Sequence, residues 1–129
     1  MLINYIMTNK IILQKLKKEA EDKFALAQDY YSVLSVLNKL HLTEREIQLV
    51  AFAAIRGNIS YANIREDFCK KYSTSSPTIN NIISKLKRLG VFIKEGNKVR
   101  VNPVIVLDFE KDVVLEIKLT HGEASKSIN

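Results

Sequence analysis

The 129-residue chain contains little cysteine, proline, glycine or tryptophan: one Cys, two Pro, four Gly and no Trp. A single cysteine, Cys69, excludes a disulfide within the chain and a metal site made of several cysteines. None of the four glycines forms a phosphate-binding loop motif. No run approaches the roughly 18 apolar residues that a membrane-spanning helix needs, so we expect no membrane partner.

Groupings typical of catalysis or metal binding are also missing. The two histidines, His41 and His121, stand far apart, and neither has a cysteine or an acid at ligand spacing. Cys69 is expected to be a small residue at the core, and the neighbouring acids Glu66 and Asp67 are typical of a helix surface. We therefore expect no enzymatic activity, no catalytic residue, no metal site and no cofactor.

Positive charge is concentrated in the middle of the chain, whose formal net charge is +6. Residues 43–103 contain eleven Lys or Arg and five acids, whereas residues 104–129 contain three Lys and five acids. This balance predicts a surface that binds a polyanion. The alternative is that the basic residues only solvate one face. The N-terminal stretch has no pattern of a secretory signal, and we expect a cytoplasmic location.

The first predicted helix runs from Phe24 to Leu40, within an N-terminal extension of residues 1–42. Its apolar residues recur at helical spacing, so it should pack either on the following domain or on a second copy of the chain. Thr43, followed three residues later by Glu46, predicts a capping box at the start of the next helix.

Two further helices are predicted before residue 90. Gly57 is expected to end the helix that starts after Thr43, and Ser60 to cap another that runs to about Tyr72. After a short polar connection, Pro77 fits the first position of a further helix, because its missing N–H is not needed there. Gly90 is expected to end that helix.

After residue 90 the apolar period changes from helical to alternating. Residues 92–94 and 98–101 flank Glu95-Gly96-Asn97, which predicts a β-hairpin. Residues 104–109 and 113–119 predict two further strands, which would form a C-terminal β segment from Val104 to Leu119. Residues 120–129 are polar and are expected to be disordered. The predicted fold class is α+β.

The helix that starts near Ser76 has an outward face of polar and basic side chains. Asn can make a bidentate contact with adenine, Ser and Thr can bond to bases or phosphate, and Lys and Arg can contact the backbone. A basic hairpin follows directly. Each side chain could equally be solvated; Arg88 could complement the helix dipole, and Arg100 could pair with Glu95. The candidate DNA-binding residues are Ser75, Ser76, Thr78, Asn80, Asn81, Ser84, Lys85, Arg88, Lys94, Asn97, Lys98 and Arg100.

The motif SSPTINNIISKLKRLGVFIK, with its serines and Leu-Gly-Val, resembles the winged helix-turn-helix domain of multiple-antibiotic-resistance-type (MarR-like) regulators and of phage or plasmid replication proteins. The resemblance covers residues 43–103. It implies a double-stranded DNA-binding protein, a transcription regulator of bacterial or phage origin acting in the bacterial cytoplasm. Residues 76–89 would enter the major groove and the wing, residues 92–101, would lie on the backbone. The C-terminal strands depart from that regulator type, whose ends are long dimerisation helices.

Two other functions stay open from the sequence. The first is a replication or other DNA-transaction protein of a phage or plasmid. The second is an interaction or assembly module, such as a phage structural component, in which the winged helix binds protein. A homo-oligomer could form through the helix from Phe24 to Leu40 or through the segment from Val104 to Leu119.

Overall fold

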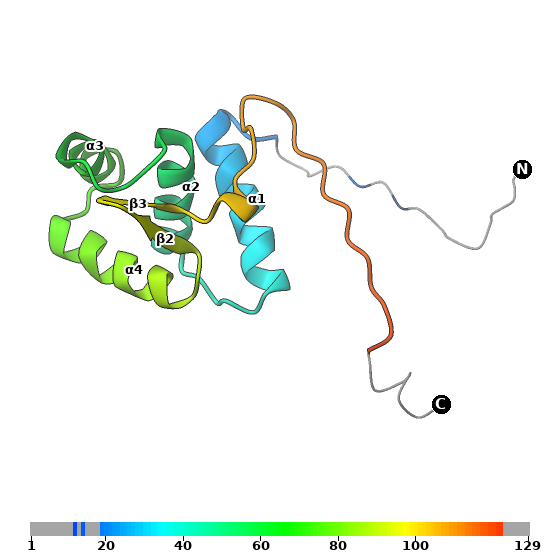
Figure 1. Cartoon of the computed structure of the whole chain (residues 1–129). Helices are drawn as coiled ribbons and strands as arrows, with labels where there is room; N and C mark the ends of the chain where they lie inside the picture. Colours follow the sequence, from blue (N-terminus) through cyan, green and yellow to red (C-terminus); the bar gives the residue numbers. More distant parts are fainter. Residues whose placement is uncertain (1–11, 13, 15–18, 123–129) are drawn as a thin grey trace, which may run out of the picture.

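The computed structural model describes residues 12, 14 and 19–122 of the chain. Most of the predicted N-terminal extension before residue 19, and residues 123–129 of the predicted tail, lie outside the described residues. Within them the architecture is α+β: four α-helices, an antiparallel hairpin and one short 3₁₀ helix (Figure 1). In chain order these are α1 (Lys23–Leu37), α2 (Glu44–Arg56), α3 (Ala62–Tyr72), α4 (Ser76–Arg88), β2 (Phe92–Glu95), β3 (Lys98–Val101) and η1 (Pro103–Ile105).

The predicted start and end of α2 are confirmed. The Thr43 hydroxyl accepts from the Glu46 N–H at 3.2 Å, and the Glu46 carboxylate accepts from the Thr43 N–H at 2.9 Å. Two N–H groups that no helical carbonyl can reach are thereby satisfied. Gly57 ends the helix with φ of 96°, a left-handed conformation that glycine adopts without steric cost.

Helix α2 lies at the centre of the core and contacts α1, α3 and β3. The Phe52 ring of α2 stacks on Phe24 of α1 at 5.5 Å between centroids and meets Phe68 of α3 edge-on at 5.4 Å. Aromatic rings favour both arrangements because of their charge distribution. The predicted first helix therefore exists, although it ends at Leu37, and it packs on α2 of its own chain.

The predicted hairpin is confirmed, and its register pairs Phe92 with Val101 and Glu95 with Lys98. Gly96 in its turn has φ of 59°. The connection between α2 and α3 continues the hydrogen bonding along the outer edge of β3. The Ile59 N–H donates to the Val99 carbonyl at 2.9 Å, and the Val99 N–H donates to the Ser60 hydroxyl at 2.6 Å.

The prediction that Ser60 caps α3 is wrong. Tyr61 is the N-cap residue and makes no side-chain cap, because the Ser60 hydroxyl is used by β3. The Asn58 side chain instead accepts from the N–H groups of Ser60 and Tyr61 at 2.9 and 3.3 Å. This Asx turn directs the chain into α3.

The predicted strands in residues 104–109 and 113–119 are also wrong. Residues 103–105 form η1, and residues 106–122 contain no helix or strand. The first part of the segment is attached to α1: the Tyr31 hydroxyl donates to the Ile105 carbonyl at 2.8 Å, and the Phe109 ring packs on Tyr30 and Tyr31. Residues 114–119 then run away from the helices (Figure 1). Among the described residues, the only sheet is the β2–β3 hairpin, and it does not pair with this segment.

Candidate nucleic-acid interface

Helix α4 is held by one apolar face. Ile79, Ile82, Ile83 and Leu86 are buried, and this spacing places them on one side of the helix. Pro77 lies in its first turn, and Gly90 follows its end with φ of 78°, as predicted. The Ser75 hydroxyl bonds to the Thr78 hydroxyl at 3.1 Å and makes no cap to the backbone.

The opposite face of α4 is a polar ridge, which we define as Asn81, Ser84 and Arg88. At 3.6 residues per turn, these three positions lie within a narrow stripe opposite Leu86. All three are exposed. Ser76 and Thr78 are also exposed at the N-terminal end of the helix. The helix sequence, SPTINNIISKLKR, contains no acid, so nothing on α4 itself repels an anion.

The two edges of α4 are tied to neighbouring helices. On one edge the Lys85 ammonium lies 3.0 Å from the Glu46 carboxylate of α2. On the other edge the Asn80 amide oxygen accepts from the Arg65 guanidinium of α3 at 2.6 Å. Arg65 also donates through Nε to the Ile59 carbonyl at 2.8 Å. Lys85 and Asn80, both predicted DNA contacts, thus already have partners within the protein.

The electrostatics at Glu46 favour the ionised carboxylate. Burial by itself would raise its pKa, but the hydrogen bond from the Thr43 N–H and the contact with Lys85 outweigh burial, and the net pKa lies below its ordinary value of 4.5. The carboxylate therefore stays charged at neutral pH. One acid joins the start of α2 to the middle of α4.

The hairpin residues divide into paired and unpaired cations. Arg100 pairs with Glu95 at 2.9 Å, as its spacing suggested. The Lys98 ammonium lies 5.4 Å from the centre of the Tyr61 ring, a cation–π distance. Lys94 and Asn97 are exposed, and within residues 19–122 no carboxylate forms an ion pair with Lys94. Helix α4 and β2 are in contact, so the hairpin stands beside the helix that carries the ridge.

The sequence did not indicate the roles of Arg65 and Ile59. Arg65 joins Asn80 to the connection before α3, yet in the sequence it is one cation among several on a helix. The part of Glu46 in the capping box was predicted, but its contact with Lys85, 39 residues away, was not. No local pattern specifies contacts of this kind.

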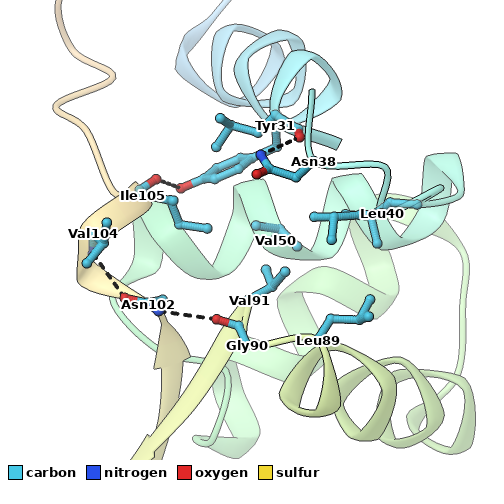
Figure 2. A pocket seen from close by; sticks show the side chains of 12 residues that line it. Tyr31, Asn38, Leu40, Val50, Leu89, Gly90, Val91, Asn102, Val104 and Ile105 are labelled. Carbon is cyan, nitrogen blue, oxygen red and sulfur yellow. Dashed lines mark hydrogen bonds between the residues drawn. The ribbon is translucent and has the colours of Figure 1, made fainter. Parts of the chain in front are cut away.

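An apolar cavity of about 250 Å³ lies between α1, the end of α4 and η1 (Figure 2). Its wall includes Tyr31, Val50 and Val91, together with two asparagines. Asn38 donates to the Leu34 carbonyl at 2.9 Å, and Asn102 donates to the Gly90 carbonyl at 3.2 Å and accepts from the Val104 N–H at 3.1 Å. Both amides are already hydrogen-bonded to backbone groups of the protein. The ridge on α4 is therefore the better candidate for binding a polar ligand.

Among the described residues, no group of three His, Cys, Asp or Glu side chains is placed to bind a metal ion. No helix in the same part of the chain is long and apolar enough to span a membrane. Comparison with protein-family models, with curated proteins and with solved structures finds no match for this chain.

Proposed function

We propose that residues 43–103 form a winged helix-turn-helix domain that binds double-stranded DNA and acts as a transcription regulator of bacterial or phage origin. The order of elements supports this: two helices, α2 and α3, precede the exposed helix α4, and a basic hairpin follows it. In this proposal α4 lies in the major groove and the hairpin lies on the adjacent phosphate backbone. An α-helix fits the width of that groove in B-DNA.

One observation carries the proposal: the ridge of Asn81, Ser84 and Arg88 is exposed on a helix without acids. Asn81 offers both a donor and an acceptor, the pair that adenine matches in the major groove. Ser84 can bond to a base or a phosphate, and Arg88 can bind either guanine or a phosphate. The ridge therefore combines base-reading and phosphate-binding side chains along one line.

The described contacts also divide ten of the twelve candidate residues by role. Asn81, Ser84 and Arg88, with Ser76 and Thr78 at the start of the helix, are proposed to touch DNA directly. Lys94 and Asn97 are proposed to meet the backbone from the hairpin. Lys85, Asn80 and Arg100 have protein partners and are proposed to hold the interface in shape.

The test measures binding of the full chain to labelled duplexes by fluorescence anisotropy over a range of salt concentrations. A random duplex pool, enriched on the protein, supplies the preferred sequence and a scrambled control. The wild-type affinity should fall as salt rises, because bound phosphates release counterions. Absence of salt-dependent duplex binding at low ionic strength would contradict the proposal.

Two substitutions separate reading of bases from binding of phosphate. Asn81→Ala should reduce discrimination between preferred and scrambled duplexes by about 1–3 kcal/mol, the usual worth of a bidentate base contact. Lys94→Ala should weaken both duplexes equally and lower the salt slope by about one phosphate contact. Lys111→Ala is the control, because Lys111 is also an exposed lysine, on the C-terminal segment, and its ion contact with Asp108 is a long one of 3.9 Å. An effect of Lys111→Ala as large as that of Lys94→Ala would argue against a role for the hairpin.

A further inference from the structure

Residues 114–119, VLEIKL, form an exposed segment rich in apolar side chains, whereas Val113 just before them packs partly against the core. The side chains of Val114 and Leu119 are 91% exposed, and that of Ile117 is 54% exposed. Exposed apolar side chains gathered on one extended segment favour association, because an unpaired backbone edge is ready to accept another strand. Scattered surface residues would not have this pattern.

The start of the segment is fixed on the domain. Phe109 is buried against Tyr30 and Tyr31, and Glu110 forms an ion pair with Lys23 of α1 at 2.9 Å. Beyond this attachment the chain runs away from the helices (Figure 1). The segment is therefore presented to the surroundings from a defined place on the protein.

The order of side chains makes the segment complementary to itself. In an extended strand, alternate side chains point to opposite faces. Val113, Leu115, Ile117 and Leu119 would share one face, whereas Val114, Glu116 and Lys118 would share the other. A negative and a positive charge thus stand two residues apart, symmetrically about Ile117.

We propose that residues 115–119 pair with the same residues of a second copy as an antiparallel two-stranded ribbon, with Ile117 opposite Ile117. In this register each Glu116 faces Lys118 of the other copy, and each Leu115 faces Leu119. The two opposite-charge pairs lie on one face of the ribbon and the apolar pairs on the other. Directly opposed side chains are the main contacts that stabilise such a pair of strands.

The charges select this register from its alternatives. A parallel, in-register pair would place Glu116 opposite Glu116 and Lys118 opposite Lys118. Moving the antiparallel register so that position 116 or 118 faces itself also brings like charges together, which is destabilising. A shift by one residue puts apolar side chains opposite charged ones and mixes the two faces. Among the antiparallel registers centred within one residue of Ile117, only the one centred on Ile117 itself satisfies both requirements.

A ribbon of two strands is marginal by itself in water. We therefore expect a dimer that dissociates on dilution, in addition to the folded domain that each copy already has. This pairing does not depend on DNA binding: it uses residues far along the chain from α4. It can therefore be true or false whatever the outcome of the duplex-binding test.

The test exchanges charges in the full chain and measures mass by sedimentation and native mass spectrometry. Glu116→Lys alone should weaken self-association by about tenfold or more, since two opposite-charge pairs become two like-charge pairs. Lys118→Glu alone should have the same effect. A mixture of the two variants, one of them isotopically labelled, should form a heterodimer at least as tight as the wild-type dimer.

Asp112→Lys is the matched control, because it makes the same charge change at an exposed position whose partner in this register is Gly122. It should leave the dissociation constant within about twofold, a change that corresponds to screened surface charges. A wild-type chain that stays monomeric over all accessible concentrations overturns the proposal. A wild-type dimer whose charge variants fail to combine preferentially with each other overturns it equally.

Circular dichroism of each variant establishes that the helices are retained. The exposed positions 116 and 118 lie outside every helix and strand, so the substitutions should leave folding unchanged.

Discussion

The hairpin β2–β3 and residues 113–119 have similar patterns of alternating apolar and polar residues, yet only the hairpin forms strands. Phe92, at the start of β2, is 1% exposed, whereas Leu119 is 91% exposed. Gly96 turns the hairpin so that its two halves meet, and α4 and α2 cover its apolar side. Residues 113–119 have neither a tight turn nor a covering helix within the described chain.

The difference shows that alternation is a requirement for a strand but does not supply its partner. A strand must pair its backbone groups and cover its apolar face. The hairpin does the first through β2, β3 and the Ile59–Ser60 connection, and the second through Phe92 and Val101. Within the described residues, the C-terminal segment has neither a paired strand nor a covered apolar face.

The largest change in the free energy of unfolding is expected when one apolar side chain is removed from each of the two regions in turn. Phe92→Ala should lower the free energy of unfolding by about 3–5 kcal/mol, because it leaves a cavity in the core. Leu119→Ala should change that free energy by less than about 0.5 kcal/mol, because its side chain contacts mainly solvent in the single chain. Chemical denaturation followed by circular dichroism measures both. Equal losses for the two variants would mean that the C-terminal segment is part of the folded core.

A smaller loss of stability is expected from a substitution at Gly96, in the turn of the hairpin. Gly96→Ala should destabilise the protein by about 1–2 kcal/mol, because a side chain is disfavoured at φ of 59°. An added Cβ would meet no atom within 4 Å at Gly96 or at Gly122, so sterics with neighbours do not contribute. Gly122→Ala is the matched control and should be nearly neutral, since its φ lies outside the left-handed range. Thermal unfolding of both variants distinguishes a strained turn from a general glycine effect.

The smallest change in the free energy of unfolding is expected at the ion pair between Glu46 of α2 and Lys85 of α4. The folded pKa of Glu46 lies below 4.5, so its charge stabilises the fold above about 4.5 and this contribution is lost as pH falls through the folded pKa. Glu46→Gln should cost less than about 1 kcal/mol at pH 7, because Lys85 is partly exposed. The difference between variant and wild type should shrink on acidification.

Glu44→Gln controls for the helix dipole, because it removes an exposed acid from the same first turn. If Glu44→Gln reproduced the whole pH dependence, the Lys85 contact would not be its source.

The sequence predicted most of the helices and the hairpin because their signals are local. Thr43 and Glu46 lie three residues apart, and Pro77 and Gly96 restrict their own backbone. The sequence predicted the candidate DNA-binding residues, but it did not predict which of them bond to other residues of the protein. Lys85 and Asn80 look as available as Asn81 in the sequence, and only their contacts with Glu46 and Arg65 set them apart.

The C-terminal strands were predicted from the same alternation of apolar and polar residues that correctly predicted the hairpin. That prediction was wrong because a strand needs a partner strand, which the sequence of one segment does not specify. The sequence by itself determined that four helices form, where α2 begins and ends, where the hairpin turns, and that α4 has an apolar and a polar face. Within the described residues, the tertiary structure decided which polar side chains on α4 have protein partners, that Ser60 serves β3, and that residues 113–119 form no strand. The physical reason is distance in the sequence: caps and turns act over a few residues, whereas these contacts join residues 15 or 39 positions apart.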